Sequence, residues 1–229
     1  MVNIAANLTH IHTQIIEAKN NFASKGQRVE LIAVSKTRTV AEIEQAIAAG
    51  QRHFGENYLQ EALSKITQLA HQQDLVWHFI GPIQSNKTRE IAGNFDWVHS
   101  VDRLKIAERL SQQRPVNLSP LNICIQINID NEPTKSGVTL GNLLSLAVEI
   151  NRLPRLHLRG LMAIPRPQRE LTLQRQCFRR VRSALESLQR AGLLELDTLS
   201  MGMSDDFVAA IAEGATFIRL GTAIFGERV

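Results

Sequence analysis

Short apolar runs alternate with longer amphipathic stretches along the chain, and this alternation is the clearest signal in the sequence. An amphipathic helix is predicted first, over about Ile4–Phe22. Residues 40–49 carry apolar side chains at helical spacing, and Gly50 follows as a typical helix stop. Repeated strand and helix segments predict an α/β fold with a parallel sheet. Eight strands are predicted, over Leu31–Lys36, His53–Asn57, Val76–Gly81, Asp96–Val101, Asn122–Asn128, Leu156–Ile164, Thr198–Met203 and Phe217–Gly221.

The length favours one barrel over an open sheet. The chain has 229 residues. Removing about 30 N-terminal residues leaves roughly 200 for eight units, near the minimum for a (β/α)8 TIM-type barrel. An open doubly wound sheet would favour a GxGxxG turn after the first strand, but that strand runs into SKTRTV. We therefore expect a single barrel domain over residues 1–229 with an extra N-terminal helix.

Composition narrows the class of protein. The sequence shows no apolar run of membrane-spanning length, no secretory signal pattern, and two cysteines without metal-site spacing, Cys124 and Cys177. These features predict a cytoplasmic protein with free thiols and no membrane partner. The net charge is only +4 and aromatic residues are 5%, so a small anionic ligand fits the balance better than a nucleic acid.

The end of the first strand carries the first candidate for chemistry, Lys36. Ile32 and Val34 share its face by the two-residue period, and that face should look into the barrel. Desolvation there would lower the pKa of the amine, and a neutral amine can attack a carbonyl. The alternatives are that Lys36 reaches solvent or pairs with Glu56 at the next strand end.

The last two strands end in groups that suit a phosphate. Ser204 is predicted to cap the helix after strand seven, and Gly221 and Thr222 follow strand eight. Barrels often bind phosphate at this pair of loops. Plain helix capping and a tight turn are the alternatives, and Asp205 and Asp206 would have to point away from a phosphate.

Arg219 lies two residues before Gly221, on the same face of its strand. A guanidinium inside a barrel must find an acceptor, which can be a carboxylate, a carbonyl or an unprotonated ring nitrogen. An amine, a phosphate site and an internal arginine together suggest a phosphorylated aromatic aldehyde. Pyridoxal 5′-phosphate (PLP) has all three matching groups.

Several motifs, in order, resemble the pyridoxal phosphate homeostasis proteins (the YggS/PROSC family). The motifs are AVSKT at 33–37, FGENYLQE at 54–61, WHFIGPIQSNK at 77–87, KSG at 135–137, RGLMAIP at 159–165, LSMGMSDD at 199–206 and RLGTAIFG at 219–226. The resemblance covers nearly the whole chain. One departure is the segment after Pro165, RPQRELTLQRQ, which is short and polar.

The resemblance implies a barrel like the N-terminal domain of alanine racemase. It implies that Lys36 carries PLP as an internal aldimine and that Arg219 faces the pyridine nitrogen. It also implies that Asn57 lines the ring, and that the phosphate is held by Ser204, Gly221 and Thr222. Members of this family are implied to act in PLP homeostasis and amino-acid balance.

The sequence favours a PLP carrier or regulator over an enzyme. An arginine donor keeps the pyridine nitrogen unprotonated, which makes the ring a poorer electron sink. A racemase needs a second acid–base group, but Tyr58 is predicted at a helix start and Cys124 in the core. A PLP-dependent racemase and a cofactor-free Schiff-base aldolase are the alternatives.

The remaining expectations concern partners and metals. We expect a monomer whose partners are PLP and apo PLP-enzymes or amino acids. Lys135 is either a second amine for the aldehyde or an exposed lysine. His53, His78 and His99 fall near three successive strands, but no metal site is expected, because His53 starts its strand whereas His78 lies in the middle of its own.

Overall fold

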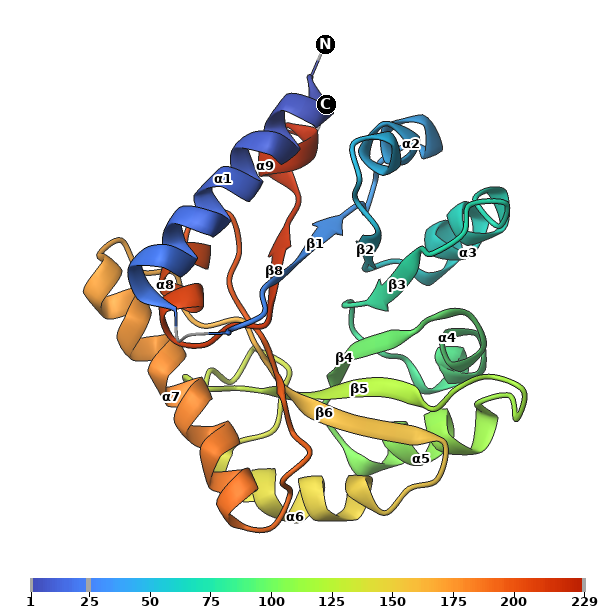
Figure 1. Ribbon diagram of the computed structural model, residues 1–229. Helices are drawn as coiled ribbons and strands as arrows, with labels where there is room; N and C mark the ends of the chain where they lie inside the picture. Colours follow the sequence, from blue (N-terminus) through green and yellow to red (C-terminus); the bar gives the residue numbers. More distant parts are fainter. Residues whose placement is uncertain (1, 24–25, 228–229) are drawn as a thin grey trace.

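Eight parallel strands close into a barrel in the order of the sequence, and β8 pairs with β1 (Figure 1). The structure is a computed structural model that describes residues 2–23 and 26–227. The strands are β1 Glu30–Val34, β2 His53–Glu56, β3 Val76–Phe79, β4 Trp97–Val101, β5 Leu121–Ile127, β6 Leu156–Ala163, β7 Thr198–Ser200 and β8 Phe217–Leu220. The predicted barrel is confirmed.

Helices follow the strands and cover the outside of the barrel (Figure 1). The N-terminal helix α1 covers Ile4–Phe22, as predicted. Its buried face packs on α8 and α9. The remaining helices are α2 Val40–Ala48, α3 Leu59–Gln68, the 3-10 helix η1 Ser85–Lys87, α4 Thr88–Asn94, α5 Leu104–Gln113, α6 Leu140–Asn151, α7 Leu171–Arg190, α8 Phe207–Ala212 and α9 Thr222–Phe225.

Seven of the eight strands end one to three residues earlier than the sequence suggests, and the ends of β1 and β7 matter most for the site. β1 ends at Val34, so Lys36 lies in the turn that follows rather than in the strand. β7 ends at Ser200, and backbone hydrogen bonds to β8 continue at Met201 and Gly202, where Gly202 adopts φ +97°. The polar segment after Pro165 is a loop up to Glu170, where α7 begins.

The barrel interior contains both apolar and polar side chains. A small cluster of buried residues is formed by Ile32, Trp97, Cys124, Met162 and Phe217. The rings of His53, His78 and His99 pack against Phe217 and each other in the same space. His78 and His99 have no solvent-exposed surface.

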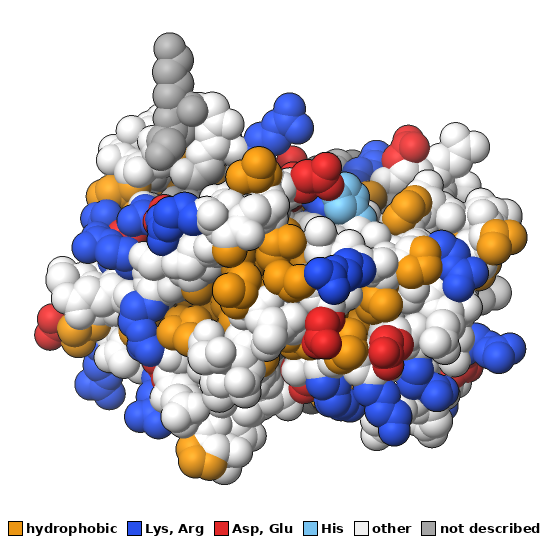
Figure 2. Space-filling model, turned by 90° about the horizontal axis from the view of Figure 1, so that it is seen from below, with side chains coloured by type: hydrophobic (Ala, Val, Ile, Leu, Met, Phe, Trp, Pro, Cys, Tyr) orange, Lys and Arg blue, Asp and Glu red, His pale blue; other side chains and the backbone are white. Residues whose placement is uncertain are grey.

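A large groove lies outside the barrel, between α6 and α7. It has a volume of about 610 Å³, and Leu140 and Leu144 on its wall are 46% and 47% exposed. The underside of the molecule shows hydrophobic side chains with both basic and acidic side chains around them (Figure 2). The groove lies away from the strand ends, and none of the predicted ligand-binding residues lines it. Within residues 2–23 and 26–227, every helix is too short or too polar to span a bilayer.

Burial of the histidines makes stability depend on pH. Burial lowers the pKa of His78 well below 6.5, and burial lowers the pKa of His99 to about 3. Below pH 6.5 these histidines therefore bind protons in the unfolded chain but not in the folded chain, so acid favours unfolding. Each such histidine should cost about 1.4 kcal/mol of stability per pH unit.

Urea denaturation at about pH 7.5 and about pH 5.5 tests this expectation. The wild-type chain should lose more stability on acidification than His78→Gln, whose side chain does not titrate. Equal losses for the two proteins would contradict the expectation.

Candidate functional site

The ends of six strands converge on one pocket of about 220 Å³. It contains all six residues predicted from the sequence to bind a ligand: Lys36, Asn57, Ser204, Arg219, Gly221 and Thr222. The rest of the lining consists of Arg38 and five apolar residues, Val34, Ile80, Met162, Ile164 and Met203. Residues from distant parts of the sequence thus meet at the C-terminal end of the barrel, where such folds place their sites.

The pocket is strongly electropositive. Lys36, Arg38 and Arg219 line it, and no Asp or Glu does. The side chain of Asp206 instead accepts a hydrogen bond from the backbone N–H of Met203 at 2.6 Å, and Asp205 is exposed away from the lining. Such a lining suits an anionic ligand.

Arg38 was missed in the sequence analysis. Its guanidinium donates to Glu42 at 3.4 Å and to the carbonyl of Gly226, and it lies 5.8 Å from the ring centre of Phe225. These contacts hold a cation beside the C-terminal end of α9. Its place two residues after Lys36, in the same loop, was the available signal.

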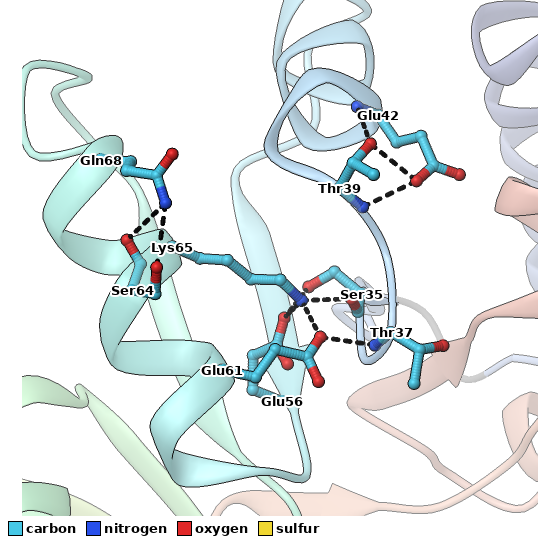
Figure 3. Close-up of polar contacts among 9 residues, drawn as sticks. All are labelled: Ser35, Thr37, Thr39, Glu42, Glu56, Glu61, Ser64, Lys65 and Gln68. Atoms are coloured by element: carbon cyan, nitrogen blue, oxygen red, sulfur yellow. Dashed lines mark hydrogen bonds and ion pairs between the residues drawn. The ribbon is translucent and has the colours of Figure 1, made fainter.

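A buried ionic cluster holds the backbone on both sides of Lys36 (Figure 3). Lys65 on α3 donates to the carbonyl of Ser35 at 2.6 Å, to Glu56 Oε1 at 2.7 Å and to Glu61. Glu61 in turn accepts from the backbone N–H of Thr37 at 2.6 Å. Thr37 has φ +63°, a left-handed conformation that costs free energy for a β-branched residue. The cluster therefore fixes the turn that presents Lys36.

Glu56 has no exposed surface. Burial raises the pKa of its carboxyl group, and the positive charge of Lys65 opposes that rise. The Ser35 hydroxyl donates to the same oxygen, Oε1, at 2.6 Å. The sequence suggested Glu56 as a partner for Lys36. In the structure, Glu56 Oε1 is bound by Lys65 and Ser35.

Asn57 brings an unsatisfied acceptor to the pocket. Its Oδ1 is buried and has no hydrogen-bond partner, a state that buried polar atoms rarely keep. Its backbone is held against Gly81, where an added Cβ would meet the Asn57 carbonyl oxygen at 2.2 Å. A ligand that donates a hydrogen bond would satisfy this oxygen.

Arg219 is a buried cation, only 5% exposed, with neutral partners. It donates to Ser200 Oγ at 2.7 Å and to the carbonyl of Ala163 at 3.1 Å. Burial lowers its pKa to about 10, so it stays protonated near neutral pH. In the part of the chain that the structure describes, it forms no ion pair with a carboxylate, so one edge of the site holds a fixed donor.

One local prediction was wrong. Ser204 is not the helix cap, because α8 begins later and Asp206 occupies the N-cap position. Ser204 lies in the preceding turn and is exposed at the pocket. Gly221 is the N-cap of the short helix α9, and its carbonyl accepts from the N–H of Phe225 at 2.9 Å. A Cβ at Gly221 would approach the Val34 carbonyl at 3.3 Å, so a small residue suits this close contact between β1 and β8.

The other candidate groups lie outside the pocket. Tyr58 is the N-cap residue of α3 and is 54% exposed, whereas Cys124 is fully buried and burial raises its pKa. Lys135 forms an ion pair with Glu132 at 2.7 Å beside a neighbouring hollow. Across the described ranges, no group of three or more His, Cys, Asp or Glu residues is arranged to hold a metal ion.

Comparisons with known proteins agree with this architecture. Residues 7–229 match the family described as "Alanine racemase, N-terminal domain". The chain is 55% identical over 228 residues to the "Pyridoxal phosphate homeostasis protein" of Pseudomonas aeruginosa, covering 100% of this chain and 97% of that protein.

Two solved structures are also similar. PipY of Synechococcus elongatus, solved with PLP bound, matches with a TM-score of 0.86 and 38% identity, over 97% of this chain and all of PipY. Alanine racemase of Corynebacterium glutamicum matches with a TM-score of 0.73 and 20% identity, over 99% of this chain and 60% of the racemase. The racemase shares the fold.

The cluster around Lys65 should contribute strongly to stability. Lys65→Met leaves the buried Glu56 carboxylate without its cation, so we expect a loss of about 3–5 kcal/mol in the free energy of unfolding. Removing the charge of the partner as well, in Lys65→Met with Glu56→Gln, should restore part of it. Chemical denaturation measures all three.

Lys105→Met is the control, because Lys105 is an exposed lysine on the outer helix α5. Its stability should stay within about 0.5 kcal/mol of the parent. If Lys65→Met were as stable as this control, the structural role given to the cluster would be wrong.

Proposed function

The chain belongs to the alanine racemase N-terminal domain family and, within it, to the pyridoxal phosphate homeostasis proteins, and from this premise we propose that it binds PLP in the strand-end pocket and serves PLP homeostasis and amino-acid balance. The observation that carries the proposal is the convergence of all six predicted residues on one pocket lined by three cations and no carboxylate. The orphaned acceptor of Asn57 adds a site for a ligand donor.

Each group of the ligand has a matching group in the pocket. PLP supplies an aldehyde that condenses reversibly with amines. Lys36 provides the amine for this attachment. Ser204, Gly221 and Thr222 bind the phosphate, and Arg38 adds a positive charge beside them. Arg219 donates to the ring nitrogen, and Asn57 lines the ring.

The apolar part of the lining suits a flat ring. Val34, Ile80, Met162, Ile164 and Met203 come from four separate parts of the barrel wall and complete the same pocket. Burial of ring surface against these side chains contributes binding free energy without directional contacts. The polar groups then set the orientation.

The same pocket is poorly equipped for acid–base catalysis. Arg219 remains a cation and a donor near neutral pH, so it holds the ring nitrogen as an acceptor and does not protonate it. Apart from Lys36, the lining contains no His, Tyr, Cys, Asp or Glu that could serve as a second proton carrier. We infer a carrier or regulator rather than an enzyme.

A carrier must also release what it holds. We propose that the chain acts as a monomer in the cytoplasm, with one domain over residues 1–229, and that apo PLP-enzymes or free amino acids receive the ligand. The pocket lies at the open end of the barrel, where an external amine can reach Lys36. Lys135, at the neighbouring hollow, is a second amine on this side.

Covalent attachment should depend on Lys36. Protein mixed with PLP should turn yellow, and borohydride reduction should leave the mass of PLP on the peptide containing Lys36, as mass spectrometry reports. Lys36→Ala should lose this label, since the attacking amine is gone.

Lys105→Ala provides a matched control on an exposed helix and should label like the parent. A parent chain that takes no colour and no label from PLP would refute the proposal. Labelling of Lys36→Ala at the parental level would refute the role of Lys36.

The absence of a second proton carrier predicts weak chemistry at the α-carbon of amino acids. In deuterium oxide, the PLP-loaded chain should exchange α-protons of a panel of amino acids no faster than free PLP does, as proton NMR measures. Rapid exchange that disappears in Lys36→Ala would show a true PLP enzyme instead.

A further inference from the structure

A line of hydrogen bonds runs through the barrel from Arg219 to the opposite end. Ser200 Oγ lies 2.7 Å from Arg219 Nη1 and 2.8 Å from His99 Nδ1. His99 Nε2 lies 2.9 Å from His78 Nδ1, and His78 Nε2 lies 2.9 Å from His53 Nδ1. The line joins β8, β7, β4, β3 and β2 and reaches the first residue of β2.

The three rings are neutral at neutral pH. Burial lowers the pKa of His53, lowers that of His78 well below 6.5 and lowers that of His99 to about 3. A neutral imidazole has one N–H donor and one acceptor nitrogen. Consecutive rings must therefore all donate in the same direction, and only two arrangements of the line satisfy every contact.

Ser200 distinguishes these two arrangements. Its side chain is fully buried, and its hydroxyl has two partners among the residues that the structure describes, Arg219 and His99. Arg219 can only donate, so it occupies an acceptor position of the oxygen. The hydroxyl hydrogen then has one acceptor available, His99 Nδ1. In the reverse arrangement His99 would donate to Ser200, and the hydroxyl hydrogen would be buried without an acceptor.

Charges at both ends favour the same direction. The cation of Arg219 lies at the Ser200 end and favours oxygen and nitrogen lone pairs turned toward it. The carboxylates of Glu30 and Asp96 act on His53 at the other end and favour a ring N–H turned outward. Each link of the line then has its positive end away from Arg219, which lowers the cost of burying a cation.

We propose that Ser200 and His99 are positioning residues for Arg219, which hold its guanidinium as a fixed donor toward the ligand ring. The hydrogen bonds are directed from Ser200 through His99 and His78 to His53. All three histidines are then protonated on Nε2. This proposal rests on the proposed function in one respect, namely that the ligand ring is the pyridine ring of PLP. The direction of the line belongs to the chain itself.

The tautomers can be measured on the cofactor-free protein. Nitrogen-15 NMR of the wild-type chain labelled at histidine should show Nε2–H and unprotonated Nδ1 for His53, His78 and His99, each assigned by its own substitution. His10, His12, His71 and His157 are exposed and serve as internal references. A proton on His99 Nδ1 would overturn the proposed direction.

The positioning role is tested with two substitutions of one residue. His99→Leu removes the acceptor for Ser200, whereas His99→Asn retains an amide oxygen at the level of Nδ1. We expect His99→Leu to raise the dissociation constant for PLP about tenfold, the effect of one hydrogen bond to a charged group, and to shift the visible band of the bound cofactor. His99→Asn should bind within about threefold of the parent and keep its band.

The outcomes distinguish a failure of the positioning role from a failure of the proposed function. If folded His99→Leu, judged by circular dichroism, bound PLP like the parent with the same band, the positioning role would be wrong. It would be equally wrong if His99→Asn behaved like His99→Leu. A parent chain that did not bind PLP would remove the proposed function, while the NMR measurement would still decide the direction of the line.

Discussion

A positive charge enclosed in the barrel is the constraint around which the interior is organised. A buried guanidinium cannot release its proton under ordinary conditions, so the fold must supply acceptors at fixed places. The barrel supplies a carbonyl from β6 and a hydroxyl from β7, and it leaves the side of the pocket open to a ligand. This explains why polar Ser200, His99 and His78 replace apolar side chains in a region that barrels usually fill with branched residues.

Another buried cation, Lys65, is stabilised differently and serves a different purpose. Two carboxylates accompany it, and its third contact is to the backbone beside Lys36. An ion pair of this kind fixes geometry at the cost of desolvation. Arg219 instead contacts neutral groups, so further N–H groups of its guanidinium can donate to a ligand. The contrast fits their roles, since one cation holds a turn and the other presents a donor.

Much of the fold and of the pocket follows from local patterns. Helix α1 has its predicted bounds, and the six candidate residues meet because parallel strands of a closed barrel end on one rim. Ser204 was misjudged because a turn over residues 204–206 delays the start of the helix by two residues, and residue type alone does not reveal this. The Lys65 cluster was missed because a lysine in a polar helix is usually exposed. The side chain of Lys65 is buried only because α3 packs against the barrel.

The histidines show a further limit of sequence reasoning. Positions along the strands suggested that His53 and His78 lie at different heights. In the sheet, His78 pairs in register with Gly55 rather than with His53. The tilt of barrel strands nevertheless brings the two rings into contact, since side chains from neighbouring strands meet along a diagonal. Shear of this kind is a property of the closed sheet and has no signature within one strand.

Closure of β8 on β1 has a consequence for biosynthesis. The turn with Lys36 follows the first strand, whereas other residues of the pocket follow the last two strands. The barrel closes between these segments where Glu30–Ala33 pair with Phe217–Leu220. A ribosome exposes the reactive amine long before it releases the strand that encloses it. The growing chain therefore carries an unshielded lysine and an unpaired β1 edge, and the pocket that we propose for PLP can be complete only after β8 has paired with β1.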